Sequence, residues 1–122
     1  MSTDKVMQKI MPPTVVVVGG MDPSGGAGLC ADIQTLSAMG CHAAPVVTAI
    51  TVQDTASVKK YQLLGTDLVR QQLQVVLDDL SPAVIKTGML ANGEVIAVLA
   101  DVLREYPAIK LVVDPVMRSN YN

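Results

Sequence analysis

Polar and glycine residues follow four β-rich segments of the sequence, at the point where each segment ends. The first segment leads into "GGMDPSGGAG", and the second ends at Gln53, just before Asp54 and Thr55. The third leads into "KTGM", and the fourth leads into "DPVM". The carboxyl ends of parallel strands meet at one edge of a sheet, where open α/β folds bind their ligands. We therefore expect one binding pocket, built from these four junctions.

The glycine-rich junction contains three glycines close together, and the absence of side chains there requires a physical reason. Gly25, Gly26 and Gly28 fall in the first turn of an expected helix, where each glycine costs roughly 0.5–1 kcal/mol relative to alanine. A glycine-rich helix N-terminus offers N–H groups to an anion or a polar ring. A tight turn with close packing explains one or two of the glycines. The stretch is not a Walker A motif, since no Lys-Ser or Lys-Thr pair follows, and it is not a complete GxGxxG motif.

Three further residues near the junctions have both a structural and a functional interpretation. Asp32 lies four residues after Gly28, which places it either on an exposed helix face or at the floor of the pocket. The side-chain amide of Gln53 can donate and accept hydrogen bonds, which suits a heteroaromatic amine, or it can satisfy a turn. Met89 is either a soft wall against a flat ring or an ordinary core residue.

The charged residues at the third and fourth junctions also leave alternatives open. Lys86 either neutralises a phosphate or extends its ammonium group from the end of the sheet into solvent. Asp114 either orients Mg²⁺ or a phosphate-bound water, or it begins a turn before Pro115.

The apolar pattern predicts the elements that position these residues. Short continuous apolar runs are typical of strands buried on both faces, and they occur at Val15–Val18, Val46–Val52, Ala83–Lys86 and Leu111–Val113. A hairpin-like or edge strand is expected around Val58–Leu63. Helical spacing appears from Leu29 to Leu36, from Val69 to Leu80 behind Thr66 as N-cap, and from Val95 to Leu103 behind Asn92 as N-cap. The alternation predicts an α/β fold, a doubly wound and mostly parallel sheet with helices on both faces.

The composition limits the possible functions. The 122 residues suffice for one domain or part of one, and half of them are hydrophobic. A net charge of −2 without a Lys/Arg cluster argues against a nucleic-acid partner. No apolar run approaches the roughly 18 residues needed to cross a membrane, and the start "MSTDKVMQKIMPPT" does not resemble a leader peptide. We therefore expect a cytoplasmic protein without a membrane partner, with residues 1–13 as a flexible extension.

Four motifs together indicate a family. "GGMDPSGGAGLCADIQTLSAMG", "VVTAITVQDT", "VIKTGML" and "VVDPVM", in this order and spacing, resemble the hydroxymethylpyrimidine/phosphomethylpyrimidine kinases of thiamine biosynthesis. These kinases belong to the ribokinase-like superfamily. The resemblance covers Val15 to Met117, and it implies phosphorylation of 4-amino-5-hydroxymethyl-2-methylpyrimidine and then of its monophosphate, with ATP and Mg²⁺.

The resemblance also implies roles for individual residues. Gly20 would approach the pyrimidine ring, and Asp32 and Gln53 would hydrogen-bond its exocyclic amine and ring nitrogens. Met89 and Val116 would form apolar walls around the ring. The bare backbone of the glycine stretch would let the helix start close to the substrate and the incoming phosphate.

The resemblance also implies that Asp114 lies on the phosphate and metal side of the site. Family members are roughly twice as long, and the anion hole and the residue that activates the hydroxyl lie in their second half. We therefore expect residues 14–122 to be the N-terminal part of a ribokinase-like kinase domain, without catalytic residues of its own and with weak or no activity. A homodimer is expected for a full-length protein. Two alternatives remain, namely a pyridoxal or pyridoxine kinase and a non-catalytic pyrimidine-binding fragment.

Overall fold

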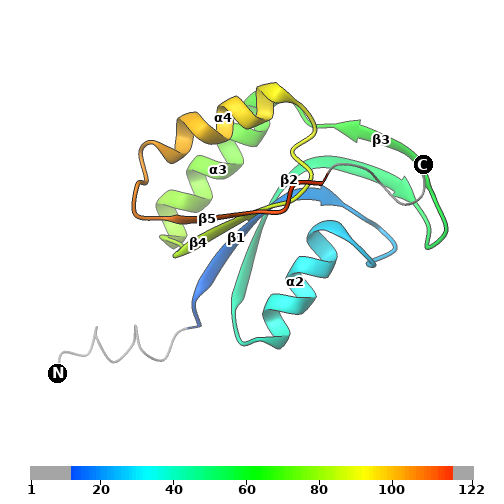
Figure 1. Ribbon diagram of the computed structural model, residues 1–122, viewed down its shortest axis with the longest axis horizontal. Helices are drawn as coiled ribbons and strands as arrows, with labels where there is room; N and C mark the ends of the chain where they lie inside the picture. The colour runs from blue at the N-terminus through cyan, green and yellow to red at the C-terminus, as the bar shows by residue number, and fades with distance from the viewer. Residues whose placement is uncertain (1–11, 117–122) are drawn as a thin grey trace.

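The computed structural model describes residues 12–116, which form a five-stranded sheet with helices on both faces (Figure 1). The strands are β1 (Thr14–Met21), β2 (His42–Gln53), β3 (Val58–Leu63), β4 (Val84–Thr87) and β5 (Lys110–Val113). The helices are α2 (Gly28–Ala38), α3 (Thr66–Leu80) and α4 (Gly93–Leu103). The strand order is β3-β2-β1-β4-β5, and only the β2–β3 pair is antiparallel. The predicted doubly wound, mostly parallel sheet is confirmed, including its edge strand β3.

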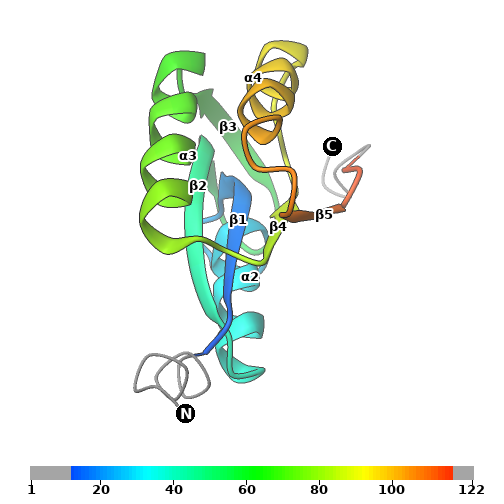
Figure 2. The same cartoon turned by 90° about the vertical axis from the view of Figure 1, so that its left-hand side faces the viewer.

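The two faces of the sheet are covered by helices to different extents. Helices α3 and α4 pack on one face and α2 lies on the other (Figure 2). The main core fills the space under α3 and α4, and its fully buried members include Val16, Val18, Val46, Val69, Leu73, Ile85 and Val102. On the opposite face, α2 contributes one fully buried side chain, Leu29, which lies over Gly19 of β1.

Helix α2 begins later than predicted. Its first helical residue is Gly28 and its N-cap is Ala27, which has an extended backbone. Gly25 and Gly26 therefore lie in the preceding loop, and the prediction that all three glycines belong to the first helical turn is wrong.

The N-caps of the other two helices give one wrong and one confirmed prediction. Thr66 is the first residue of α3, and the N-cap is Gly65, whose extended backbone presents its carbonyl oxygen to the first turn at 3.1 Å. Asn92 caps α4 as predicted, because its side-chain oxygen accepts a hydrogen bond from the N–H of Val95 at 3.0 Å. Two adjacent residues can both begin a helix, so the sequence leaves such a boundary uncertain by one position.

An irregularity in β2 is held by a side chain from α3. The register between β1 and β2 shifts between Gly19 and Gly20. Next to this shift, the side-chain amide of Gln72 donates to the carbonyl oxygen of Val47 and accepts from its N–H, both at 3.0 Å. Gln72 thus satisfies backbone groups that a bulged strand leaves without a ladder partner.

Some expectations fall partly outside the described residues. The extension expected over residues 1–13 lies outside them up to residue 11, and so does the end of the chain from residue 117 onward. Within residues 12–116, no helix is long and apolar enough to cross a membrane.

Candidate functional site

A cavity of about 830 Å³ lies at the carboxyl ends of the parallel strands. The chain leaves β1 toward β2 on one side, and it later returns to β4 on the other side of β1. This reversal makes a topological switch point, where α/β sheets bind their ligands. The cavity is lined by all six residues predicted for the site, namely Gly20, Asp32, Gln53, Met89, Asp114 and Val116.

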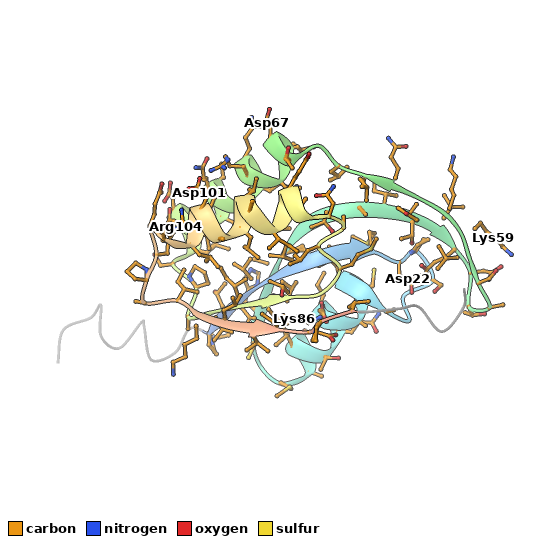
Figure 3. All side chains as sticks on the ribbon, turned by 45° about the horizontal axis from the view of Figure 1, so that its top comes forward. Asp22, Lys59, Asp67, Lys86, Asp101 and Arg104 are labelled. Atoms are coloured by element: carbon orange, nitrogen blue, oxygen red, sulfur yellow. The ribbon has the colours of Figure 1, made fainter. Side chains whose placement is uncertain are left out.

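The loop between β1 and α2 is organised by Asp22, a residue absent from the predicted site. The Asp22 residue is 4% exposed, and its carboxylate accepts hydrogen bonds from the N–H and the hydroxyl of Ser24 at 2.8 and 2.7 Å. Burial raises the pKa of this carboxyl, but the hydrogen bonds from Ser24 and from the N–H groups of Ala27 and Gly26 outweigh burial, so the pKa is lowered. The N–H groups of this loop are therefore already engaged by an internal anion, which is labelled in Figure 3. The sequence signal for this turn is Asp followed by Pro, Ser and Gly.

The bare backbone at Gly28 is required by a contact within the protein. Gly28 has a φ of +59°, and a Cβ built on it would stand 2.4 Å from the carbonyl oxygen of Gly20. Its backbone also pairs with Met21 in an isolated antiparallel bridge. Gly28 therefore lets the start of α2 press against the end of β1, at the wall of the cavity.

Asp32 and Lys86 form an ion pair in the cavity wall. The Lys86 Nζ lies 2.9 Å from Asp32 Oδ1 and 3.0 Å from Asp32 Oδ2. The Asp32 side chain is 20% exposed and the Lys86 side chain is 24% exposed, so water screens this pair only in part. Asp32 thus lies in the cavity wall rather than on an exposed helix face, and the Lys86 ammonium binds a carboxylate instead of extending into solvent.

Hydrogen bonds hold the rim of the cavity together. The hydroxyl of Thr51 donates to the carbonyl oxygen of Met21 at 2.8 Å, which ties β2 to the end of β1. The hydroxyl of Thr48 donates to the carbonyl oxygen of Met89 at 2.7 Å, which fixes the segment after β4. The Met89 sulfur lies so close to Gly20 that a Cβ there would be 3.2 Å away. Gly20 and Met89 therefore form one continuous part of the wall.

An exposed carboxylate, that of Asp114, also lines the cavity. Asp114 follows β5 and is exposed, and its N–H donates to the carbonyl oxygen of Thr87 at 2.9 Å. No cluster of three or more His, Cys, Asp or Glu residues that could hold a metal occurs within residues 12–116. A single accessible carboxylate fits Mg²⁺, which proteins commonly hold with one or two carboxylates, waters and substrate phosphates.

Sequence comparisons connect this site to known proteins. The family model described as phosphomethylpyrimidine kinase matches residues 22–122. A probable thiamine biosynthetic bifunctional enzyme, chloroplastic, from Oryza sativa subsp. japonica is 46% identical over 107 residues, which are 88% of this chain and 20% of the relative. The hydroxymethylpyrimidine/phosphomethylpyrimidine kinase of Mycobacterium tuberculosis H37Rv is 41% identical over 109 residues, which are 88% of this chain and 40% of the relative.

Solved structures share the fold. The phosphomethylpyrimidine kinase of Clostridium difficile 630 matches with a TM-score of 0.81 and 39% identity, over 89% of this chain and 47% of that one. The pyridoxal kinase of Staphylococcus aureus in complex with pyridoxal matches with a TM-score of 0.78 and 34% identity, over 88% of this chain and 40% of that one. The chain thus spans between 20% and 40% of the length of these two curated relatives. The extent of the family match and these identities show that the chain belongs to the phosphomethylpyrimidine kinase family.

Proposed function

We propose that this chain forms the pyrimidine-binding part of a kinase of thiamine biosynthesis. The substrate is 4-amino-5-hydroxymethyl-2-methylpyrimidine and then its monophosphate, and the phosphoryl donor is ATP with Mg²⁺. The observation that carries the proposal is that Asp32 and Gln53, from α2 and β2, line one cavity with Gly20, Met89 and Val116. Family membership supports the same substrate class.

The chemistry of these side chains suits an aminopyrimidine. Its exocyclic amine donates hydrogen bonds and its ring nitrogens accept them. The Asp32 carboxylate accepts only, while the Gln53 amide can do both, so the two side chains complement the ring edge. The apolar surfaces of Met89 and Val116 would cover the ring faces.

Asp114 is assigned to the phosphate and metal side of the cavity. One solved structure of the S. aureus pyridoxal kinase is a complex with AMP-PCP and pyridoxal, which supports ATP as the phosphoryl donor here. When bound, Mg²⁺ would neutralise charge on the phosphoryl group. Asp114 would contribute a carboxylate oxygen to that ion.

The proposal also covers the catalytic groups, the oligomeric state and the cell compartment. We assign the groups that activate the hydroxyl and hold the transferred phosphoryl to parts of the kinase outside these 122 residues, and we expect a homodimer of the full-length enzyme. The predicted cytoplasmic location is retained for this chain, although the rice relative is named chloroplastic.

Calorimetric titration of the 122-residue protein with 4-amino-5-hydroxymethyl-2-methylpyrimidine tests the proposal. Binding should be measurable, and it should be lost in Asp32→Ala and Gln53→Ala. Asp79→Ala, which removes an exposed carboxylate from α3, should bind like the unaltered protein. If the folded protein gives no heat of binding, the pyrimidine site is refuted.

The same protein should not phosphorylate the pyrimidine with ATP and Mg²⁺ above background. Phosphoryl transfer depends on positioning and on electrostatic stabilisation of the transferred group. Measured turnover would show that residues of this chain suffice for catalysis, and it would overturn the assignment of catalytic groups to other parts of the kinase.

A pyridoxal kinase activity is the second candidate, because the S. aureus pyridoxal kinase shares 34% identity and the same fold over this region. Parallel titrations with pyridoxal and with the pyrimidine separate the two. Tighter binding of pyridoxal would favour the second candidate, and tighter binding of the pyrimidine would exclude it as the main function.

A further inference from the structure

We propose that Lys86 is a positioning residue, whose ammonium fixes the Asp32 carboxylate in the cavity wall for recognition of the substrate amine. This inference rests on the proposed function, because it takes Asp32 as an acceptor for the bound pyrimidine. It adds a residue from β4 that has no direct role in the proposed pyrimidine contacts.

The hydrogen-bonding capacity of the pair allows this role. An ionised carboxylate offers about four acceptor positions on its two oxygens. Lys86 contacts both oxygens, at 2.9 and 3.0 Å, so about two positions remain for a ligand. Because one cation spans both oxygens, rotation of the carboxylate about its last bond is restricted.

The fold directs Lys86 toward α2. Its neighbours in β4, Ile85 and Thr87, are buried on the side of the sheet that α3 and α4 cover. Successive side chains of a strand point to opposite faces, so Lys86 extends toward α2 (Figure 3). Asp32 is a residue of α2. The two residues are 54 positions apart in the sequence, so the pair depends on the packing of α2 against the sheet.

Gly88 leaves the space that the ammonium occupies. A Cβ built on Gly88 would stand 3.3 Å from Lys86 Nζ. The N–H of Gly88 donates to the carbonyl oxygen of Val18 at 2.8 Å, which holds this segment beside β1. The backbone of Gly88 does not have a positive φ, so alanine fits the backbone there and crowds only the ammonium.

Two other charged side chains, those of Asp22 and Lys59, have partners other than Asp32 and Lys86. Asp22 is held by Ser24 and the loop amides. Lys59 lies 3.8 Å from Asp54, and both of these side chains are more than half exposed. Lys59 and Lys60 are exposed, whereas the Lys86 side chain is only 24% exposed. Lys86 is therefore the most buried of the three lysines that line the cavity, and its two short contacts are to Asp32.

A double-mutant cycle on pyrimidine affinity tests the inference. In calorimetric titrations with 4-amino-5-hydroxymethyl-2-methylpyrimidine, Lys86→Met should weaken binding about tenfold, within the range of coupling between contacting residues. Asp32→Asn should weaken binding at least as much. If Lys86 acts through Asp32, the double variant should bind no more weakly than Asp32→Asn alone.

Two further variants make the cycle specific. Arg70→Met breaks a second short ion pair, Arg70–Asp101 at 2.7 Å on the surface, and it should leave pyrimidine affinity unchanged. Gly88→Ala should weaken binding a few-fold in the unaltered protein and should have no effect in the Asp32→Asn background. Circular dichroism and thermal unfolding of each variant establish that it is folded.

The outcomes separate this inference from the proposed function. If the Lys86→Met and Asp32→Asn losses multiply in the double variant, Lys86 acts independently of Asp32 and the positioning role is overturned. Unchanged affinity in Lys86→Met overturns it as well, and in both cases the pyrimidine site stands. If the unaltered protein does not bind the pyrimidine, or Asp32→Asn binds normally, the proposed role of Asp32 fails and the inference fails with it.

Discussion

Gly28 packs directly against the carbonyl oxygen of Gly20, and a Cβ on Gly28 would stand 2.4 Å from that oxygen. The contact joins the first residue of α2 to the end of β1, and both glycines line the cavity. The position of α2, and with it the position of Asp32, therefore depends on the absence of a side chain at Gly28.

Gly28→Ala should lower the free energy of unfolding by about 2–5 kcal/mol. The left-handed backbone costs an alanine roughly 1–2 kcal/mol, and the overlap with Gly20 adds about 1–3 kcal/mol. Gly40→Ala is the matched control, since Gly40 has a φ of +80° with no atom within 4 Å of the added Cβ. Urea unfolding measures both variants. Equal losses would show that the Gly20 contact costs nothing beyond backbone strain.

Asp22→Asn should destabilise the protein at neutral pH, and the difference should shrink in acid. The folded-state pKa of Asp22 is lowered from its ordinary value of 3.8. A lowered pKa means that this carboxylate contributes stability above that value and loses the contribution as pH falls through the folded pKa. Urea unfolding at pH 7 and pH 3 should show the two proteins converging. If they are equally stable at pH 7, the hydrogen bonds of Asp22 do not stabilise the loop.

Gln72→Ala should destabilise the protein by about 2–6 kcal/mol, because it leaves an N–H and a carbonyl of Val47 without partners at a cost of ~1–3 kcal/mol each. Gln71→Ala is the control, since Gln71 is the exposed neighbour on the same helix. Denaturant unfolding of the two variants makes the comparison. Similar losses in both would indicate that water replaces the Gln72 amide at the irregular strand.

The phenol of Tyr106 should ionise late in an alkaline titration. The hydrogen bond to Asp78, together with burial and the nearby negative charges, raises the pKa of Tyr106 to about 12, from 10.0. Its contribution to stability is therefore complete below pH 10.0 and is lost as pH rises toward about 12. Absorbance titration of the phenolates should show a late component that disappears in Tyr106→Phe and persists in Tyr61→Phe. A late component that survives in Tyr106→Phe would contradict the assignment.

Much of the fold could be predicted from local pattern. Continuous apolar runs indicated the strands, and a spacing of three and four residues indicated the helices, because both patterns report which residues are buried. Asn92 was predicted as a cap because its side chain reaches an N–H only three positions away. The choice between Gly65 and Thr66 could not be made this way, since both suit a helix start and only the path of the chain from β3 selects one.

The candidate site also has some features that the sequence predicted and others that it did not. The polar junctions after the predicted strands indicated one pocket, and the family resemblance implied that Gly20, Asp32, Gln53, Met89, Asp114 and Val116 belong to it. The structure places all six around one cavity. Their roles toward a ligand stay predictions. Asp22 carries a local turn signal in its own sequence neighbourhood, so it was within reach of sequence reasoning.

The strands, the helices and the edge of the sheet where polar residues gather can be predicted from the amino-acid sequence, because the spacing of apolar residues is a local property of the chain. Three contacts could be found only in the folded structure, namely Lys86 with Asp32, Gln72 with Val47 and Gly28 with Gly20. Each of these contacts joins residues on different elements. Their distance in space depends on how α2 and α3 pack across the sheet, which no local pattern encodes.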